Sequence, residues 1–127
     1  MPENNLYEYA VIRVVPRIER EEFINVGLLL FCKRKRYIRV RIAVDEQKLA
    51  LYSTECERET LLSQLSAWEI IASGQTAGGY IASLDVDERF RWLTAIRSAT
   101  IQTSRPHSGY TRHLDATFDR LFRELVL

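Results

Sequence analysis

Residues 23–32, FINVGLLLFC, restrict the possible folds of this chain more than any other segment does. Their side chains alternate as in a β-strand, and both alternating sets are largely apolar: Ile24, Val26, Leu28, Leu30 and Cys32 on one, with Phe23, Leu29 and Phe31 on the other. A strand that is apolar on both sides lies inside a sheet and is at least partly covered on both faces. We therefore expect a sheet with this segment at its centre.

Two further segments have the pattern of strands that pair with it. Residues 6–16 are rich in Tyr, Val and Ile and end at Pro16, which cannot donate to a β-ladder. Residues 37–44 alternate between an aliphatic face and a face that carries Arg39 and Arg41. Because the connections between the three segments are short, they are predicted to form an antiparallel meander.

The rest of the chain is predicted to be mainly helical. Asp45 and Asp85 are placed to cap helices, and Thr54 with Glu57 has the spacing of a capping box before a helix that Gly74 ends. The last helix is expected to start near Leu114, where apolar side chains begin to recur at helical spacing.

Strands followed by helices indicate an α+β fold. We predict one domain over residues 1–127, in which three or four antiparallel strands pack against about three helices. The fourth strand is a short segment at 100–104 that returns beside the first strand, and residues 73–83 and 105–113 are predicted loops. The helices are expected to cover one face, because arginines line the other face of residues 37–44.

Composition limits the possible functions. With 18 Lys and Arg against 17 Asp and Glu, the net charge of +1 provides no overall attraction to nucleic acid. The longest apolar run, residues 26–32, is far shorter than the ~20 residues of a membrane-spanning helix. The first ten residues lack the pattern of a secretory signal, so we expect a cytoplasmic protein that does not associate with membranes.

Cysteine chemistry is not expected to matter for function. Cys32 and Cys56 are predicted to be free, mostly buried thiols, because a cytoplasmic chain stays in a reducing environment. Neither has a second Cys or a His at ligand spacing. No metal site and no cofactor is predicted.

Asn25 and Gly27 are the unusual residues of the central segment, and by strict alternation they share one face. A glycine inside a strand indicates either a β-bulge or a close approach of another group. One interpretation is therefore a bulge in which Asn25 bonds a neighbouring turn. The other is a notch in the sheet where a partner or ligand approaches and Asn25 supplies a polar contact.

The order of several motifs resembles a known family. The pattern Tyr9, Val11, Arg13, Pro16, Glu22, Asn25, Val26 and Gly27, followed by QTSRP at 102–106 and LDATFDRLFRELV at 114–126, resembles the bacterial family called "domain of unknown function 3037". This resemblance implies a cytosolic bacterial protein, and family members are often encoded beside a HipA-like kinase, which implies a protein partner. The expected function is then that of a non-catalytic accessory or interaction protein. Its predicted contact surface consists of Arg13, Asn25, Gly27, Ser104 and Arg105.

Residues 33–41, KRKRYIRVR, support an alternative function. Phosphates could pair with cations such as Arg39 and Arg41 while bases stack on Tyr37, as in nucleic-acid-binding sheets. Arg13 would join these arginines if their faces match. The other interpretation is a solvated hairpin whose charges are neutralised by nearby glutamates.

Residues 102–113, QTSRPHSGYTRH, support a second alternative. Hydroxyl and guanidinium groups before a helix suit an anion such as phosphate, and His107 with His113 could exchange protons near neutral pH. A small phosphate-handling enzyme or ligand-binding protein would need these groups to converge. An ordered surface loop explains the same residues. Because the sequence indicates no nucleophile or orienting group, no catalytic residue is assigned.

Overall fold

The computed structural model describes residues 3–50, 58–95 and 100–127. The predicted capping box at Thr54 and Glu57, and the state of Cys56, lie outside the described residues. Cys32 is a buried free thiol.

The described residues form an antiparallel sheet of five strands: β1 (Asn5–Val14), β2 (Ile24–Cys32), β3 (Tyr37–Ile42), β4 (Ile101–Thr103) and β5 (His107–Thr111). The strand order is β3-β2-β1-β4, and β5 also pairs with β1. β4 lies beside Ile12–Val14 and β5 beside Asn5–Tyr9, so the two short strands follow each other along one edge of β1. The predicted meander and the late strand are confirmed.

In the part of the chain that the structure describes, the α-helices are α1 (Glu46–Ala50), α2 (Arg58–Ser73), α3 (Gly79–Ala82), α4 (Val86–Leu93) and α5 (Leu114–Leu125), with 3-10 turns η1 (Ile18–Arg20) and η2 (Thr76–Gly78). The predicted caps are present, since the Asp45 carboxylate accepts from the backbone N–H groups of Gln47 and Lys48, and Asp85 accepts from Val86. Gly74 follows α2 with a φ of 74°. Within the described ranges, no helix has both the length and the hydropathy needed to cross a membrane.

Two of the predicted loops contain regular structure. Residues 73–83 include η2 and α3, and residues 105–113 include β5. The β5 strand was missed because its sequence, HSGYT, has no alternating apolar residues and its side chains are mostly exposed. It is held by pairing with β1 along one edge rather than by burial.

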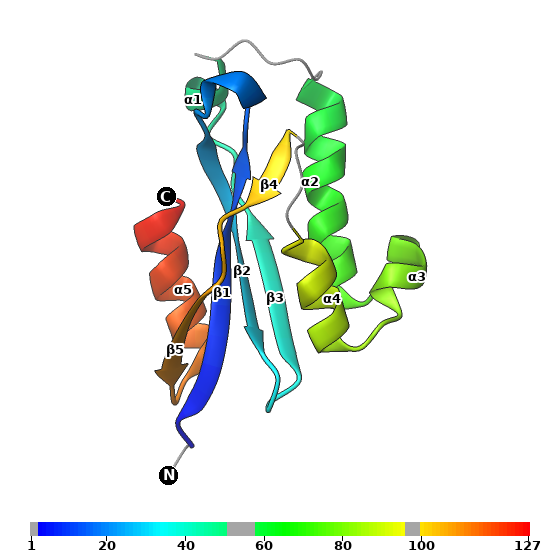
Figure 1. The fold of residues 1–127 in the computed structure, drawn as a ribbon, viewed down its shortest axis with the longest axis vertical. Helices are drawn as coiled ribbons and strands as arrows, with labels where there is room; N and C mark the ends of the chain where they lie inside the picture. The colour runs from blue at the N-terminus through cyan, green and yellow to red at the C-terminus, as the bar shows by residue number, and fades with distance from the viewer. Residues whose placement is uncertain (1–2, 51–57, 96–99) are drawn as a thin grey trace.

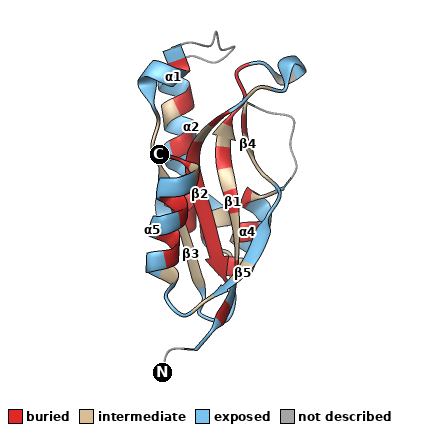
Figure 2. Ribbon diagram, turned by 90° about the vertical axis from the view of Figure 1, so that its left-hand side faces the viewer, coloured by how far each residue is buried: buried red, intermediate tan, exposed pale blue. Residues whose placement is uncertain are grey.

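Helices cover both faces of the sheet, and the expectation of a single covered face is wrong. α2 and α4 pack on one face, while α5 packs alone on the other (Figure 1). The basic face of β3 accepts α5 because the Arg39 and Arg41 guanidinium groups lie over aromatic rings, 4.2 Å from the Phe118 centroid and 4.7 Å from the Phe122 centroid. β2 is buried along nearly its whole length between these two layers (Figure 2).

A β-bulge in β2 changes the expected alternation. Ile12 lies opposite Gly27 and Arg13 lies opposite Asn25, so Val26 is an extra residue without a partner of its own. The bulge moves side chains between faces. Ile24, Val26, Leu29 and Phe31 join the core under α2 and α4, whereas Leu28, Leu30 and Cys32 join the core under α5.

The bulge also separates Asn25 from Gly27, so the prediction that they share one face is wrong. A Cβ atom on Gly27 would lie 2.6 Å from Ile42 Cδ1 and 2.9 Å from the Arg41 carbonyl oxygen. The close approach that requires glycine is therefore made by β3, on the side of the α2 and α4 core. No space for a ligand is left at this position.

Candidate functional site

Three polar side chains stand in a row across the sheet. Arg13 of β1 lies opposite Asn25 of β2 on one side and opposite Gln102 of β4 on the other. Paired residues of neighbouring strands point to the same face, and strands are spaced about 4.8 Å apart, so the row is about 10 Å long. It lies at the C-terminal end of α5, where the Asn25 Nδ2 donates to the Leu125 carbonyl oxygen at 3.0 Å.

Arg13 is the central residue of this row. Its guanidinium carbon lies 4.3 Å from the centroid of the Phe23 ring, and 48% of Phe23 is exposed. Arg13 forms no ion pair with any described residue, and its Nε is buried without a hydrogen-bond partner among them. Buried donors in folded proteins nearly always have a partner, so the Nε without one is an unusual feature of this site.

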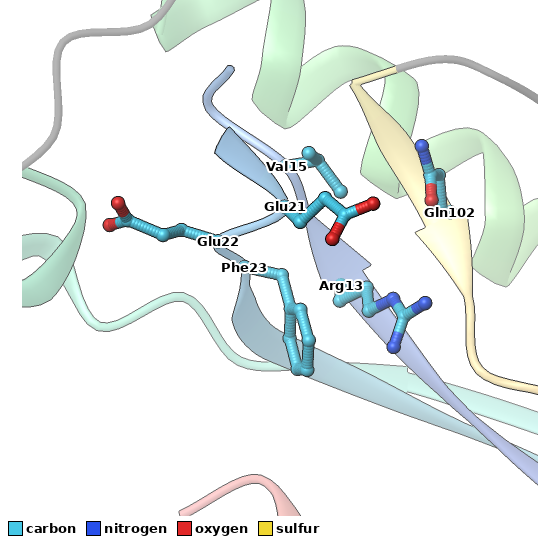
Figure 3. A pocket seen from close by; sticks show the side chains of 6 residues that line it. All are labelled: Arg13, Val15, Glu21, Glu22, Phe23 and Gln102. Atoms are coloured by element: carbon cyan, nitrogen blue, oxygen red, sulfur yellow. The ribbon is translucent and has the colours of Figure 1, made fainter. Parts of the chain in front are cut away.

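A cavity of about 390 Å³ opens beside Arg13, as Figure 3 shows. It is lined by Arg13, Val15, Glu21, Glu22, Phe23 and Gln102. The Glu21 carboxylate lies on the same side as the Arg13 guanidinium, whereas Glu22 points away and pairs with Arg20 at 2.6 Å. Glu21 has a φ of 57°, an uncommon backbone conformation for a residue other than glycine.

A second cavity, of about 660 Å³, shares Arg13 and Gln102 with the first. The remaining lining residues are Thr94, Ala95, Thr103, Ser104, Arg105 and Pro106. Arg105 is exposed and its side chain contacts no described residue through a hydrogen bond or an ion pair. Two guanidinium groups that form no ion pair within the described ranges therefore line one cavity. We call the residues Arg13, Glu21, Phe23, Gln102 and Arg105 the Arg13 surface.

Ser104 has a structural role at this edge. Its backbone N–H donates to the Val11 carbonyl oxygen at 2.8 Å, and its Oγ accepts from the Val11 N–H at 2.9 Å. The strand can therefore break after Ser104 without leaving β1 unpaired. Between the registers of β4 and β5, the three residues 104–106 stand opposite only two residues of β1, and both Arg105 and Pro106 are exposed.

The structure brings some of the predicted contact residues together and not others. Arg13, Ser104 and Arg105 line one cavity, and Asn25 lies beside Arg13 with its amide bonded to α5. Gly27 faces the opposite core. Sequence reasoning missed Phe23, Glu21 and Gln102 as members of the surface. It assigned Phe23 to a buried strand, and no local signal marks the bulge that leaves this ring half exposed.

The arginines of β3 are separate from the Arg13 surface. Arg41 and Arg39 lie opposite Leu28 and Leu30, farther along β2 than Asn25, and their guanidinium groups lie over aromatic rings of α5. Arg39 also pairs with Asp115 at 3.3 Å. The register therefore does not place Arg13 beside them.

Tyr37 and the hairpin turn are also engaged within the molecule. The Tyr37 hydroxyl donates to Asp115 at 2.6 Å; burial, together with this bond, raises the pKa of Tyr37 to about 12. In the turn, Arg34 pairs with Glu3 at 2.9 Å and Arg36 pairs with Asp85 at 2.7 Å. Much of the positive charge of residues 33–41 is thus balanced internally, and Tyr37 does not present a free ring for stacking.

The two histidines do not converge. His107 starts β5, exposed, with its ring centroid 5.4 Å from that of Tyr9. His113 is exposed beyond the other end of β5, and the extended strand separates the two by roughly 16–20 Å. Neither lines the cavities around Arg13. In the part of the chain that the structure describes, no group of three or more His, Cys, Asp and Glu side chains is placed to hold a metal ion.

The fold and the site define an α+β protein with helices on both faces of an antiparallel sheet and an unpaired arginine surface at one end of that sheet. The chain belongs to the family described as "Protein of unknown function (DUF3037)", whose model matches residues 9–126. The resemblance inferred from the sequence motifs is thereby confirmed. Comparison with curated proteins and with solved structures gave no match.

Proposed function

We propose that this protein binds another protein through the Arg13 surface and catalyses no reaction itself. The observation that carries the proposal is the unpaired Arg13 guanidinium, which stacks on the half-exposed Phe23 ring. Arginine and aromatic side chains contribute disproportionately to the energy of protein–protein contacts. A preformed pair of this kind loses little side-chain freedom when a partner binds.

The candidate partner comes from the family resemblance. Genes of this family are often found beside a gene for a HipA-like kinase, and we propose that the chain is a bacterial cytosolic accessory protein of such a kinase. The net charge of +1 supports a local contact rather than attraction through the field of the whole molecule.

The two alternatives have less support from the geometry. Binding of nucleic acid by residues 33–41 would have to compete with the ion pairs that Arg34, Arg36 and Arg39 already make. A phosphate-handling site would require His107 and His113 to approach one substrate, and they lie at opposite ends of β5.

The proposal is tested by isothermal titration calorimetry, which measures binding of the purified chain to a HipA-like kinase of the kind that the family resemblance implies. Arg13→Glu is expected to weaken binding at least about tenfold, as loss of a central arginine does in many interfaces. Lys33→Glu is the matched control, because Lys33 is exposed in the β2–β3 turn and forms no ion pair with a described residue.

Absence of binding by the unsubstituted chain would exclude the kinase as the partner. Equal weakening by Arg13→Glu and Lys33→Glu would show that the contact is not made by the Arg13 surface. Circular dichroism and thermal unfolding of each variant establish that a loss of binding does not come from a loss of folding.

A further inference from the structure

We infer that the Arg13 surface receives an extended acidic segment of the partner, with one carboxylate between Arg13 and Arg105 and an apolar side chain against Phe23. The inference rests on the proposed function, because it specifies the chemistry that the same surface recognises.

The carboxylate position follows from the two arginines. Arg13 and Arg105 line the cavity of about 660 Å³ and neither forms an ion pair with a described residue. The planar guanidinium group matches the geometry of a carboxylate and binds it through two parallel hydrogen bonds. On Arg13 the terminal Nη groups would donate these bonds, because its Nε is buried.

The apolar position lies beyond the Phe23 ring. A third cavity, of about 390 Å³, is lined by Phe23, Ile24, Asn25, Lys48, Leu125, Val126 and Leu127. Phe23 is 48% exposed and Leu127 is 71% exposed, so apolar surface is open to solvent here. Because Phe23 lines this cavity as well as the one beside Arg13, the ring separates a polar site from an apolar one.

The spacing of these sites sets the shape of the ligand. The row of Gln102, Arg13 and Asn25 crosses three neighbouring strands, a length of about 10 Å. An extended peptide rises about 3.3 Å per residue, so about three residues span the row. The acidic and the apolar side chain of the segment are therefore expected about two or three residues apart.

The charge at the site favours a single carboxylate over a polyanion. Glu21 lines the cavity beside Arg13 and forms no ion pair with a described residue, so it would repel a chain of phosphates. One carboxylate can bind on the far side of Arg13, toward Arg105. A phosphate backbone also has no apolar group that could pack against the exposed apolar surface around Leu127.

The inference is tested by nuclear magnetic resonance, with short synthetic peptides titrated into the full chain. The probe carries one Asp and one Phe about two residues apart in a Gly and Ser background. One control peptide has Lys in place of the Asp, another has Ala in place of the Phe, and a single-stranded oligonucleotide serves as the polyanion. The peptide with Asp and Phe is expected to shift the amide signals of Arg13, Phe23 and Gln102. Each control is expected to bind more weakly than this peptide.

Variants of the chain make the assignment specific. Arg105→Glu is expected to reduce the affinity for the Asp and Phe peptide at least about tenfold and to favour the Lys peptide instead. The Arg105→Glu variant should fold normally, since the Arg105 side chain has no polar partner among the described residues. It is therefore the safer test, because Arg13→Glu also removes the contact between Arg13 and Phe23. Lys33→Glu should leave binding unchanged.

The inference is overturned if the Lys peptide binds the unsubstituted chain as well as the Asp peptide does, or if the oligonucleotide binds more tightly than either. Its failure is distinguishable from that of the proposed function. If the kinase binds in an Arg13-dependent way but the peptide does not bind, the acidic segment is ruled out and the protein contact is supported. If the peptide binds but the kinase does not, recognition of an acidic segment is supported and the kinase is ruled out as the partner.

Discussion

The Ser104 hydroxyl takes the place of a backbone carbonyl opposite Val11. In a regular strand the Val11 N–H would bond to the main chain of the neighbouring strand, but here it donates to Ser104 Oγ at 2.9 Å. The same hydroxyl donates to the Arg105 carbonyl oxygen at 3.1 Å. One side chain thus allows the edge strand to break between β4 and β5 and to present Arg105 to solvent.

Replacing this hydroxyl should destabilise the edge. Ser104→Ala leaves the partly buried Val11 N–H without its acceptor, and the expected loss is about 1–2 kcal/mol of unfolding free energy. Hydrogen exchange at the Val11 amide should become faster. Exchange at the Leu28 amide, in the centre of the sheet, should become faster only by the amount that the loss of global stability explains. Ser104→Thr keeps the hydroxyl and is the control. Unaltered Val11 exchange in Ser104→Ala would show that another group accepts this bond.

Asn25 should prove important for the end of α5. The Asn25→Ala variant loses the hydrogen bond to the Leu125 carbonyl, with an expected loss of about 1 kcal/mol. Urea denaturation of Asn25→Ala measures this loss, and a variant as stable as the unsubstituted chain would contradict the contact with α5.

Gly27 should tolerate no side chain. In Gly27→Ala the new Cβ would lie 2.6 Å from Ile42 Cδ1 and 2.9 Å from the Arg41 carbonyl oxygen, so we expect a loss of about 1–3 kcal/mol by urea denaturation. Ile42→Val removes the Cδ1 atom. The double variant should recover part of the stability but not all of it, since the carbonyl stays in place. Strictly additive losses in the two single variants would argue against this packing.

Tyr37 should ionise at a higher pH than an ordinary tyrosine, so the unfolding free energy should depend on pH in the alkaline range. Its pKa is raised to about 12, so the stabilisation is fully present below the ordinary value of 10.0 and is lost as the pH rises from 10.0 toward 12. The unfolding free energy should fall more steeply over this window in the unsubstituted chain than in Tyr37→Phe. The difference between the alkaline absorbance titrations of the two proteins should have its midpoint near 12. A midpoint near 10.0 would mean that the phenol is not held by Asp115.

Those parts of the fold that depend on local patterns were predictable from the sequence. The alternation in residues 37–44 and the apolar spacing from Leu114 gave β3 and α5, and Asp45 and Asp85 marked helix starts. The position of α5 was not predictable in the same way. An arginine face normally indicates solvent, and only the contacts of Arg39 and Arg41 with Phe118 and Phe122 show that α5 packs against it.

The candidate surface was predictable only in part, because it depends on register. The sequence indicates that residues 100–104 return beside the first strand, which brings Arg105 toward Arg13. It does not show the extra residue at Val26, which turns Asn25 and Gly27 to opposite faces. The exposure of Phe23 depends on the same local geometry, and so does its stacking with Arg13.

The bulge at Val26 means that β2 holds one residue more than β1 presents opposite it. In a strand of the same length without the bulge, Ile24 would face α5 and Asn25 would enter the opposite core. Removing Val26 would instead restore simple alternation with Ile24 and Asn25 in their present orientations, so the expected cost is the loss of one buried valine from the α2 and α4 core.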